Sequence, residues 1–208
     1  PWAGHRAGTN YVTQGNLPAA LESYRTSLSI AERLALRARG NAGWQSGLAV
    51  SHDRVGNVHV AQGDLPAALE SYRASLAIRE RLALRDPGNT GWQRDLSVSH
   101  NKVGDMQEAE GNLPAALESH RVSLAIRERL ALVDPENAGW QRDLIVSNYK
   151  LFTACQKSGN GAQAAAHLEA CAAILHRMRR LGMHLDPSME GMSRQLADAG
   201  IKSSEEPC

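Results

Sequence analysis

Four cationic side chains recur at one position of this 208-residue chain, since Arg6, Arg54, Lys102 and Lys150 follow one another at intervals of 48 residues. Guanidinium and ammonium groups hold carboxylates through charge-assisted hydrogen bonds, which are roughly twice as strong as neutral ones. Polar residues one helical turn away complete the candidate binding set, which is Arg6, Arg54, Asn57, Asn101, Lys102, Tyr149 and Lys150. Residues of these types in this pattern predict a surface that receives a carboxylate or an acidic peptide.

A second interpretation of the same stripe is structural. Asp53 and Asp105 stand next to the cations and partly neutralise them. Exposed ion pairs of this kind contribute only about 0–1 kcal/mol each. The cations can therefore also be ordinary solvated residues, each paired with a neighbouring acid.

No other chemistry is supported by the residue pattern. The sequence has no Gly-rich phosphate loop, no nucleophile elbow and no acid pair placed to shift a pKa, so we expect no enzyme, no catalytic residue and no cofactor. The histidines at 52, 59 and 100 lack the spacing of metal ligands, so no metal site is predicted. With 23 Lys and Arg, 22 Asp and Glu, and 4% aromatic residues, nucleic acid is not an expected partner.

The cysteine content and the hydropathy pattern favour a cytoplasmic location for the protein. Cys155, Cys171 and Cys208 form no C-x-x-C pair, and an odd, sparse count fits a reducing compartment. Cys155 and Cys171 fall on facing helices of the last unit, where we expect small buried thiols in the helix contact. No run of about 18 apolar residues is present, so we expect no membrane span.

The elements that position these residues repeat with the same period. A Gly-Asp/Asn-Leu-Pro-Ala-Ala-Leu-Glu-Ser phrase begins at Gly15, Gly63 and Gly111, and a weaker copy begins at Gly159. Residues 63–96 and 111–144 are identical at 28 of 34 positions. A fixed period of this length predicts stacked structural repeats.

One repeat predicts two antiparallel helices. Apolar and small residues spaced for one helix face predict a first helix over 44–62. Gly63 ends that helix, Asp64 caps the next one, and Pro66 lies in its first turn, where a missing N–H costs nothing. The Asp-Pro-Gly-Asn segment 86–89 ends the second helix. Neither helix can bury its apolar face alone, so neighbouring repeats must cover it.

The spacing of small, aromatic and leucine residues resembles the tetratricopeptide repeat family. The resemblance rests on Gly56, Gly63, Ala68, Tyr72 and Leu76, and on the equivalent sets Gly8, Gly15, Ala20, Tyr24, Leu28 and Gly104, Gly111, Ala116, His120, Leu124. The usual period of that family is about 34 residues. The longer period here resembles the long-helix variants found in kinesin light chains and in many bacterial repeat arrays.

The resemblance implies an all-α, right-handed α-solenoid of antiparallel helix pairs. In such proteins the first helix of each unit lines a concave groove, and chaperone-binding members hold a peptide carboxylate there with Lys, Arg and Asn. We therefore expect a protein–protein interaction module that binds a peptide or helix of a partner. Two alternatives are a self-assembling scaffold and a regulatory region beside a larger effector enzyme.

The repeats predict the domain organisation. We expect an array over 1–187, with units near 1–38, 39–86, 87–134 and 135–187, followed by a capping helix and tail over 188–208. Met189, Met192 and Leu196 form the apolar stripe of the cap, which should end near Gly200. Because the chain begins at Pro1 inside a unit, we expect its start to be cut from a longer array.

Two aromatic features complete the expectations. Phe152 stands where the earlier units have glycine, which predicts a different helix separation in the last unit. Trp44, Trp92 and Trp140 recur at the start of each first helix. We expect these tryptophans to pack against the end of the preceding helix, and the alternative is a ladder that anchors a peptide.

Overall fold

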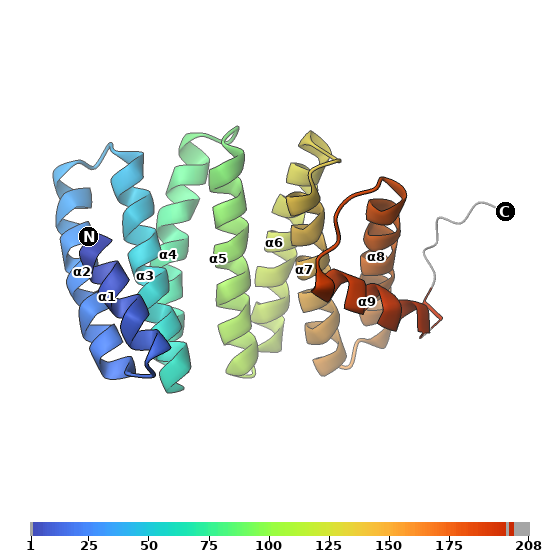
Figure 1. Cartoon of the computed structure of the whole chain (residues 1–208), viewed down its shortest axis with the longest axis horizontal. Coiled ribbons are helices and arrows are strands. Elements are labelled where there is room, and N and C mark those ends of the chain that lie inside the picture. Colours follow the sequence, from blue (N-terminus) through green and yellow to red (C-terminus); the bar gives the residue numbers. More distant parts are fainter. Residues whose placement is uncertain (1, 199, 202–208) are drawn as a thin grey trace. The chain divides into compact units, whose positions relative to one another are not determined.

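The structure is a computed structural model that describes residues 2–198, 200 and 201, and side chains from Arg6 onward. The described residues form nine helices and no strand (Figure 1). The helices are α1 (Trp2–Thr13), α2 (Leu17–Arg37), α3 (Ala42–Gln62), α4 (Leu65–Arg85), α5 (Thr90–Ala109), α6 (Leu113–Val133), α7 (Ala138–Lys157), α8 (Gly161–Arg180) and α9 (Pro187–Asp198). In this part of the chain, none of them combines the length and the apolar character that crossing a membrane requires.

The chain divides into two compact units, residues 1–111 and 112–208, which are described separately. In the first unit, α1 packs on α2, α2 on α3, α3 on α4, and α4 on α5. In the second, α6 packs on α7, α7 on α8, and α8 on α9. Within each unit, short turns reverse the chain between successive helices as far as α8, whereas α9 lies across α8 (Figure 1).

The predicted turn between paired helices is confirmed in atomic detail. Gly63 takes the left-handed conformation, with φ of 78°, at the end of α3. Asp64 caps α4 by accepting a hydrogen bond from the Ala67 N–H, and Pro66 lies in the first turn. The start of α3 differs from the prediction, because Asn41 caps the helix and moves its beginning from Trp44 to Ala42.

Glycine at position 56 is required by close packing of the paired helices. A Cβ added to Gly56 would lie 2.7 Å from the Tyr72 ring, which is well inside van der Waals contact. Gly8 meets Tyr24 in the same way, at 2.5 Å. In the last repeat, Phe152 takes the position of the glycine and Leu168 that of the tyrosine. The larger side chain has thus moved from the second helix to the first.

The C-terminal helix covers the last repeat, as predicted. Met189 and Leu196 of α9 are buried in one apolar cluster with Ile145, Leu175 and Met178, and Met192 packs at its edge. Asp186 caps the helix by accepting a hydrogen bond from the Met189 N–H at 3.0 Å. α9 therefore closes an apolar face that α7 and α8 would otherwise expose to water.

The described cysteines are buried thiols. Cys155 and Cys171 are both free and fully buried, as expected for a tight helix contact. Burial raises the pKa of Cys171 to about 12, so this thiol stays protonated at neutral pH. Cys208 lies outside the described residues.

Candidate functional site

The predicted binding residues lie on the first helices of the repeats. Arg6 is exposed on α1, Arg54 and Asn57 lie on α3, and Asn101 and Lys102 lie on α5, all in the first unit. The remaining two, Tyr149 and Lys150, lie on α7 in the second unit. Within the first unit, the structure brings Arg54, Asn57 and Lys102 into one polar neighbourhood, here called the column face.

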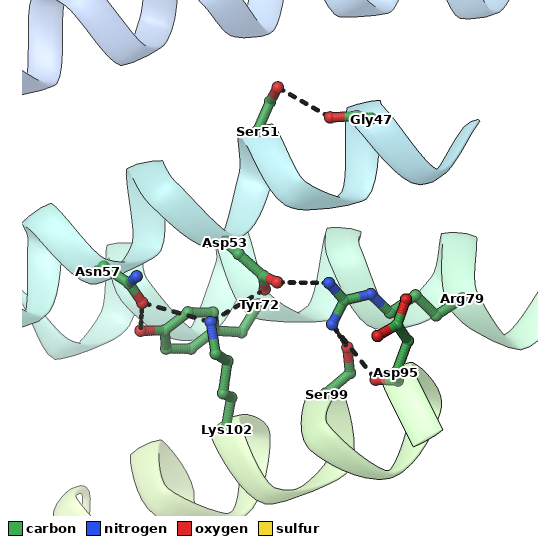
Figure 2. A network of polar contacts seen from close by, with 9 residues as sticks. All are labelled: Gly47, Ser51, Asp53, Asn57, Tyr72, Arg79, Asp95, Ser99 and Lys102. Atoms are coloured by element: carbon green, nitrogen blue, oxygen red, sulfur yellow. Dashed lines mark hydrogen bonds and ion pairs between the residues drawn. The ribbon is translucent and has the colours of Figure 1, made fainter. Parts of the chain in front are cut away.

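Lys102 is held by three groups from the preceding repeat (Figure 2). Its Nζ lies 3.5 Å from Asp53 Oδ1 and donates to Asn57 Oδ1 at 3.4 Å. The same ammonium lies 4.9 Å from the centre of the Tyr72 ring, at cation–π distance. The Tyr72 hydroxyl donates to Asn57 Oδ1 at 2.7 Å, so one amide oxygen fixes both side chains.

Arg54 occupies the equivalent position one repeat earlier. Its Nη1 donates to Thr9 Oγ1 at 3.5 Å, and its guanidinium lies 5.7 Å from the centre of the Tyr24 ring. Thr9 and Tyr24 share a hydrogen bond of 3.2 Å. Sequence reasoning found no packing role for these cations, and here the structure differs. Each cation joins its own repeat to the one before it.

A buried ion pair that sequence reasoning missed lies beside Lys102 (Figure 2). Arg79 Nη2 lies 2.8 Å from Asp53 Oδ2, and both residues are only 7% exposed. Arg79 Nη1 also donates to Ser99 Oγ at 2.7 Å and to the Asp95 carbonyl at 3.3 Å. The missed signal is that Arg79 falls seven residues after Tyr72, in the buried stripe of α4.

Charges of both signs act on Tyr72 and Lys102. Burial lowers the pKa of Lys102, Asp53 opposes this shift, and the nearby charges of Arg79 and Arg54 add to it. Burial, with the carboxylates Asp53 and Asp105, raises the pKa of Tyr72 to about 12. Lys102 therefore lies close to two other cations, Arg54 and Arg79, as well as to the carboxylate of Asp53.

The remaining predicted residues have different surroundings. Asn101 is only 4% exposed, so it offers almost no surface to a ligand. Tyr149 is 43% exposed, and its ring centre lies 5.7 Å from that of Phe152. Lys150 is half-buried, and its carbonyl accepts a hydrogen bond from Thr153 Oγ1. Arg54, Asn57 and Lys102 are therefore the best-defined group.

The tryptophans divide between packing and exposure. Trp92 packs against the cluster of Ala49, Ile78 and Leu82, as expected for a side chain that covers the preceding helix. Trp44 is 38% exposed. The backbone N–H of each tryptophan donates to the asparagine that caps its helix, from Trp44 to Asn41 and from Trp92 to Asn89.

The comparisons with known proteins support a repeat assignment. The family model described as Tetratricopeptide repeat matches residues 48–86, which span most of α3 and all of α4. Among the curated proteins, no sequence matches this chain.

Solved structures share the fold at low sequence identity. A putative kinesin light chain from Podosopora anserina, described as having nearly identical TPR-like repeats, has a TM-score of 0.68 at 19% identity, and the match covers 95% of this chain and 83% of that one. BtubC (BKLC) from P. vanneervenii has a TM-score of 0.61 at 20% identity, and 86% of this chain is covered. The match spans 64% of the BtubC chain, less than two thirds of its length.

These matches agree with the helix pairs and the capping helix described above. The fold is all-α and of the tetratricopeptide solenoid type, with a C-terminal capping helix. Such folds serve in general as protein-interaction or scaffold modules and are typically not catalytic. The family-model match identifies residues 48–86 as a tetratricopeptide repeat, and the solved structures share the fold of the chain.

Proposed function

We propose that the chain is an interaction module that binds a peptide or helix of a partner protein through the column face. The observation that carries this proposal is the partly exposed ammonium group of Lys102, which is held in place by Asn57 and Tyr72. An acidic segment, or the carboxylate at a peptide C-terminus, complements that charge. The proposal extends what the tetratricopeptide resemblance implies for the first helices.

Lys102 suits this role because its position is fixed before a ligand arrives. Immobilising a long side chain on binding costs about 0.5–1.5 kcal/mol, and a side chain that is already ordered avoids most of that cost. Asp53 does not remove the Lys102 charge completely, because the same carboxylate also binds Arg79 at 2.8 Å. The Lys102 side chain remains 26% exposed and accessible to a ligand.

The other predicted residues take supporting roles in the proposal. Arg54 is partly exposed, and its Nη1 makes only a long hydrogen bond of 3.5 Å to Thr9 Oγ1, so the guanidinium can also donate to a ligand. Exposed Asn57 and Arg6 extend the face within the first unit, and Tyr149 and Lys150 offer equivalent positions in the second. Asn101 is buried and offers almost no surface to a ligand. The buried thiols fit a reducing compartment such as the cytoplasm.

The proposal is tested with a variant that removes charge but keeps the packing stems, Arg54→Gln with Lys102→Met. Wild-type and variant chains serve as baits, captured proteins are identified by mass spectrometry, and the binding segment is titrated by fluorescence anisotropy. Binding should weaken at least about tenfold, or about 1.4 kcal/mol. The matched control is Arg73→Gln, an exposed arginine of α4, which should leave binding unchanged.

Circular dichroism must show that the variant stays folded before its affinity is interpreted. If a folded variant binds every captured segment with unchanged affinity, the column face is not the binding surface. A chain that captures nothing but sediments as a concentration-dependent oligomer would favour the scaffold alternative.

A further inference from the structure

A second surface, separate from the column face, is hollowed between α2 and α4. It is an open pocket of about 590 Å³ that also includes the start of α3. Its apolar lining includes Ala35, Leu48, Ile78 and Leu82. Leu36 also lines the pocket, although 63% of its surface remains exposed to solvent. The pocket therefore presents apolar surface to water in a folded, tightly capped chain.

The same pocket is built again in the second unit. There α6, the start of α7 and α8 line a pocket of about 500 Å³. Seven lining positions hold the same residue type, each 96 residues after its counterpart; examples are Leu36 and Leu132, and Arg81 and Arg177. The repeat that builds the fold thus also builds this pocket, once in each unit.

The exposed leucines are not explained by folding. Leu132 is 78% exposed, and Leu84, at the intervening equivalent position, is 79% exposed. A leucine that stays in water adds little to stability, because the hydrophobic effect depends on the area removed from water. Contiguous apolar surface on a folded chain instead marks an interaction site.

Arginines dominate the rim of the first pocket. Arg39, Arg81 and Arg85 line it, against the single carboxylate of Glu32. Arg85 donates to the Gly40 carbonyl at 2.7 Å, which fixes its position. Arg39 and Arg81 are exposed and make no hydrogen bond or ion pair to any residue that the structure describes. This charge balance favours an acidic occupant over a basic one.

We propose that each pocket receives a large apolar side chain of an acidic peptide segment from another protein. In the first unit, carboxylates flanking that anchor meet Arg39 and Arg81, while the anchor packs on Leu36 and Ile78. In the second unit, Leu132 and Arg177 take the equivalent roles, but Pro135 replaces Arg39 and Glu128 stands against the single arginine, so we expect the acidic peptide to bind more weakly there. This surface differs from the column face in its helices and in its chemistry, since it requires an apolar anchor as well as acidic groups.

The test uses fluorescein-labelled 12-residue peptides that carry Asp and Glu around a central pair of residues. The pair is Leu-Leu, Ile-Ile or Phe-Phe in the test set and Ser-Ser in the first control. A second control keeps Leu-Leu but replaces the acids with Lys. Fluorescence anisotropy with the full chain should show saturable binding of the acidic peptides that have an apolar pair, and much weaker binding of both controls.

Two variants assign that binding to the pockets. Arg81→Glu with Arg177→Glu, and separately Leu36→Ser with Leu132→Ser, should each weaken binding at least about tenfold. Arg73→Glu, which changes an exposed α4 arginine outside the pocket lining, should have no effect. The column-face variant Arg54→Gln with Lys102→Met should also bind these peptides normally, which separates this inference from the proposed function.

Three results would overturn the inference. Equal binding of the Ser-Ser control would show attraction by charge alone, and no saturable binding by any acidic peptide would exclude an acidic occupant. Concentration-dependent sedimentation that is lost on Leu36→Ser with Leu132→Ser would show that a second copy of this chain covers the pockets instead.

Discussion

The same position of the repeat is arginine inside the chain and leucine at its end. In residues 1–111, Arg79 of α4 bonds to Asp53 and to Ser99 of α5. In residues 112–208, the equivalent residue of α8 is Leu175, which is 1% exposed and packs in one cluster with Met189 of α9. Both side chains are buried, so the difference follows from what the next helix offers: polar acceptors from α5, and apolar side chains from α9.

The comparison indicates how this chain specifies its helix contacts. Arg127 in the second unit repeats the arrangement of Arg79, because its Nη1 donates to the Asp143 carbonyl at 2.6 Å and to Ser147 Oγ at 3.0 Å. A buried arginine is satisfied only where acceptors stand at the correct height along the next helix. Leucine has no such requirement. We infer that arginine sets the register between repeats, whereas leucine only fills the apolar contact between the last repeat and α9.

Giving the internal position the terminal residue, Arg79→Leu, should have the largest effect. The free energy of unfolding is expected to fall by about 4 kcal/mol, because the Asp53 carboxylate stays buried without its 2.8 Å partner. Urea unfolding followed by circular dichroism measures the loss. Adding Asp53→Asn, the residue found at the equivalent position 101, should recover at least about 1 kcal/mol. If Arg79→Leu left the free energy of unfolding unchanged, the ion pair would contribute nothing to stability.

Leu175→Ala tests the terminal contact and should cost about 3 kcal/mol, through lost burial and the cavity left under α9. Hydrogen exchange should also speed up in α9, since Met189 and Leu196 share that cluster. Leu181→Ala removes the same side chain from a position that is 46% exposed, and should change stability by less than about 0.5 kcal/mol. Equal losses at the two leucines would contradict this packing role of Leu175.

Gly56→Ala tests the exchange of large and small residues between the paired helices. A Cβ only 2.7 Å from the Tyr72 ring should cost about 2 kcal/mol by overpacking. Combining it with Tyr72→Leu, which imitates Leu168, should be less damaging than the sum of the two changes. Gly47→Ala in the same helix has nothing within 4 Å of the added atom and should stabilise by about 0.5–1 kcal/mol. Thermal and urea unfolding decide between these outcomes.

The smallest expected effect is on how stability depends on pH. It concerns one repeat position, which is histidine at 52 and 100 and asparagine at 148. Burial lowers the pKa of His52, against the charges of Glu32 and Asp53, and burial also lowers that of His100. The unfolded chain then takes up protons first, so stability should fall as pH decreases below the ordinary value of 6.5. His52→Asn with His100→Asn copies Asn148 and should flatten this slope.

Unfolding midpoints between about pH 7.5 and pH 5.5 measure the effect. The remaining slope should reflect His167 in the second unit, whose pKa is lowered by burial and by Arg121. A double variant that keeps the full pH dependence would show that His52 and His100 are not its source.

Local chemistry made the helix ends and the cap predictable. Gly63, Asp64 and the stripe from Met189 to Leu196 act through their own turn or helix, so short stretches of sequence contain the signal. The buried Arg79 escaped prediction because charged side chains are usually exposed, and its burial depends on acceptors from other helices. The pockets were missed for a similar reason: the sequence shows leucine at 36, 84 and 132, but not that these side chains stay exposed.

The sequence by itself determined the period, the helix pairs and the closing helix, because backbone propensity and apolar spacing operate over a few residues. Only the tertiary structure decided which charges are buried, which are paired and which remain for a partner. Arg79 and Asp53 are 26 residues apart, and Lys102 and Asn57 are 45 apart. Arg79 and Asp53 meet across the paired helices of one repeat, and Lys102 and Asn57 meet across successive repeats, so both contacts depend on how whole helices pack.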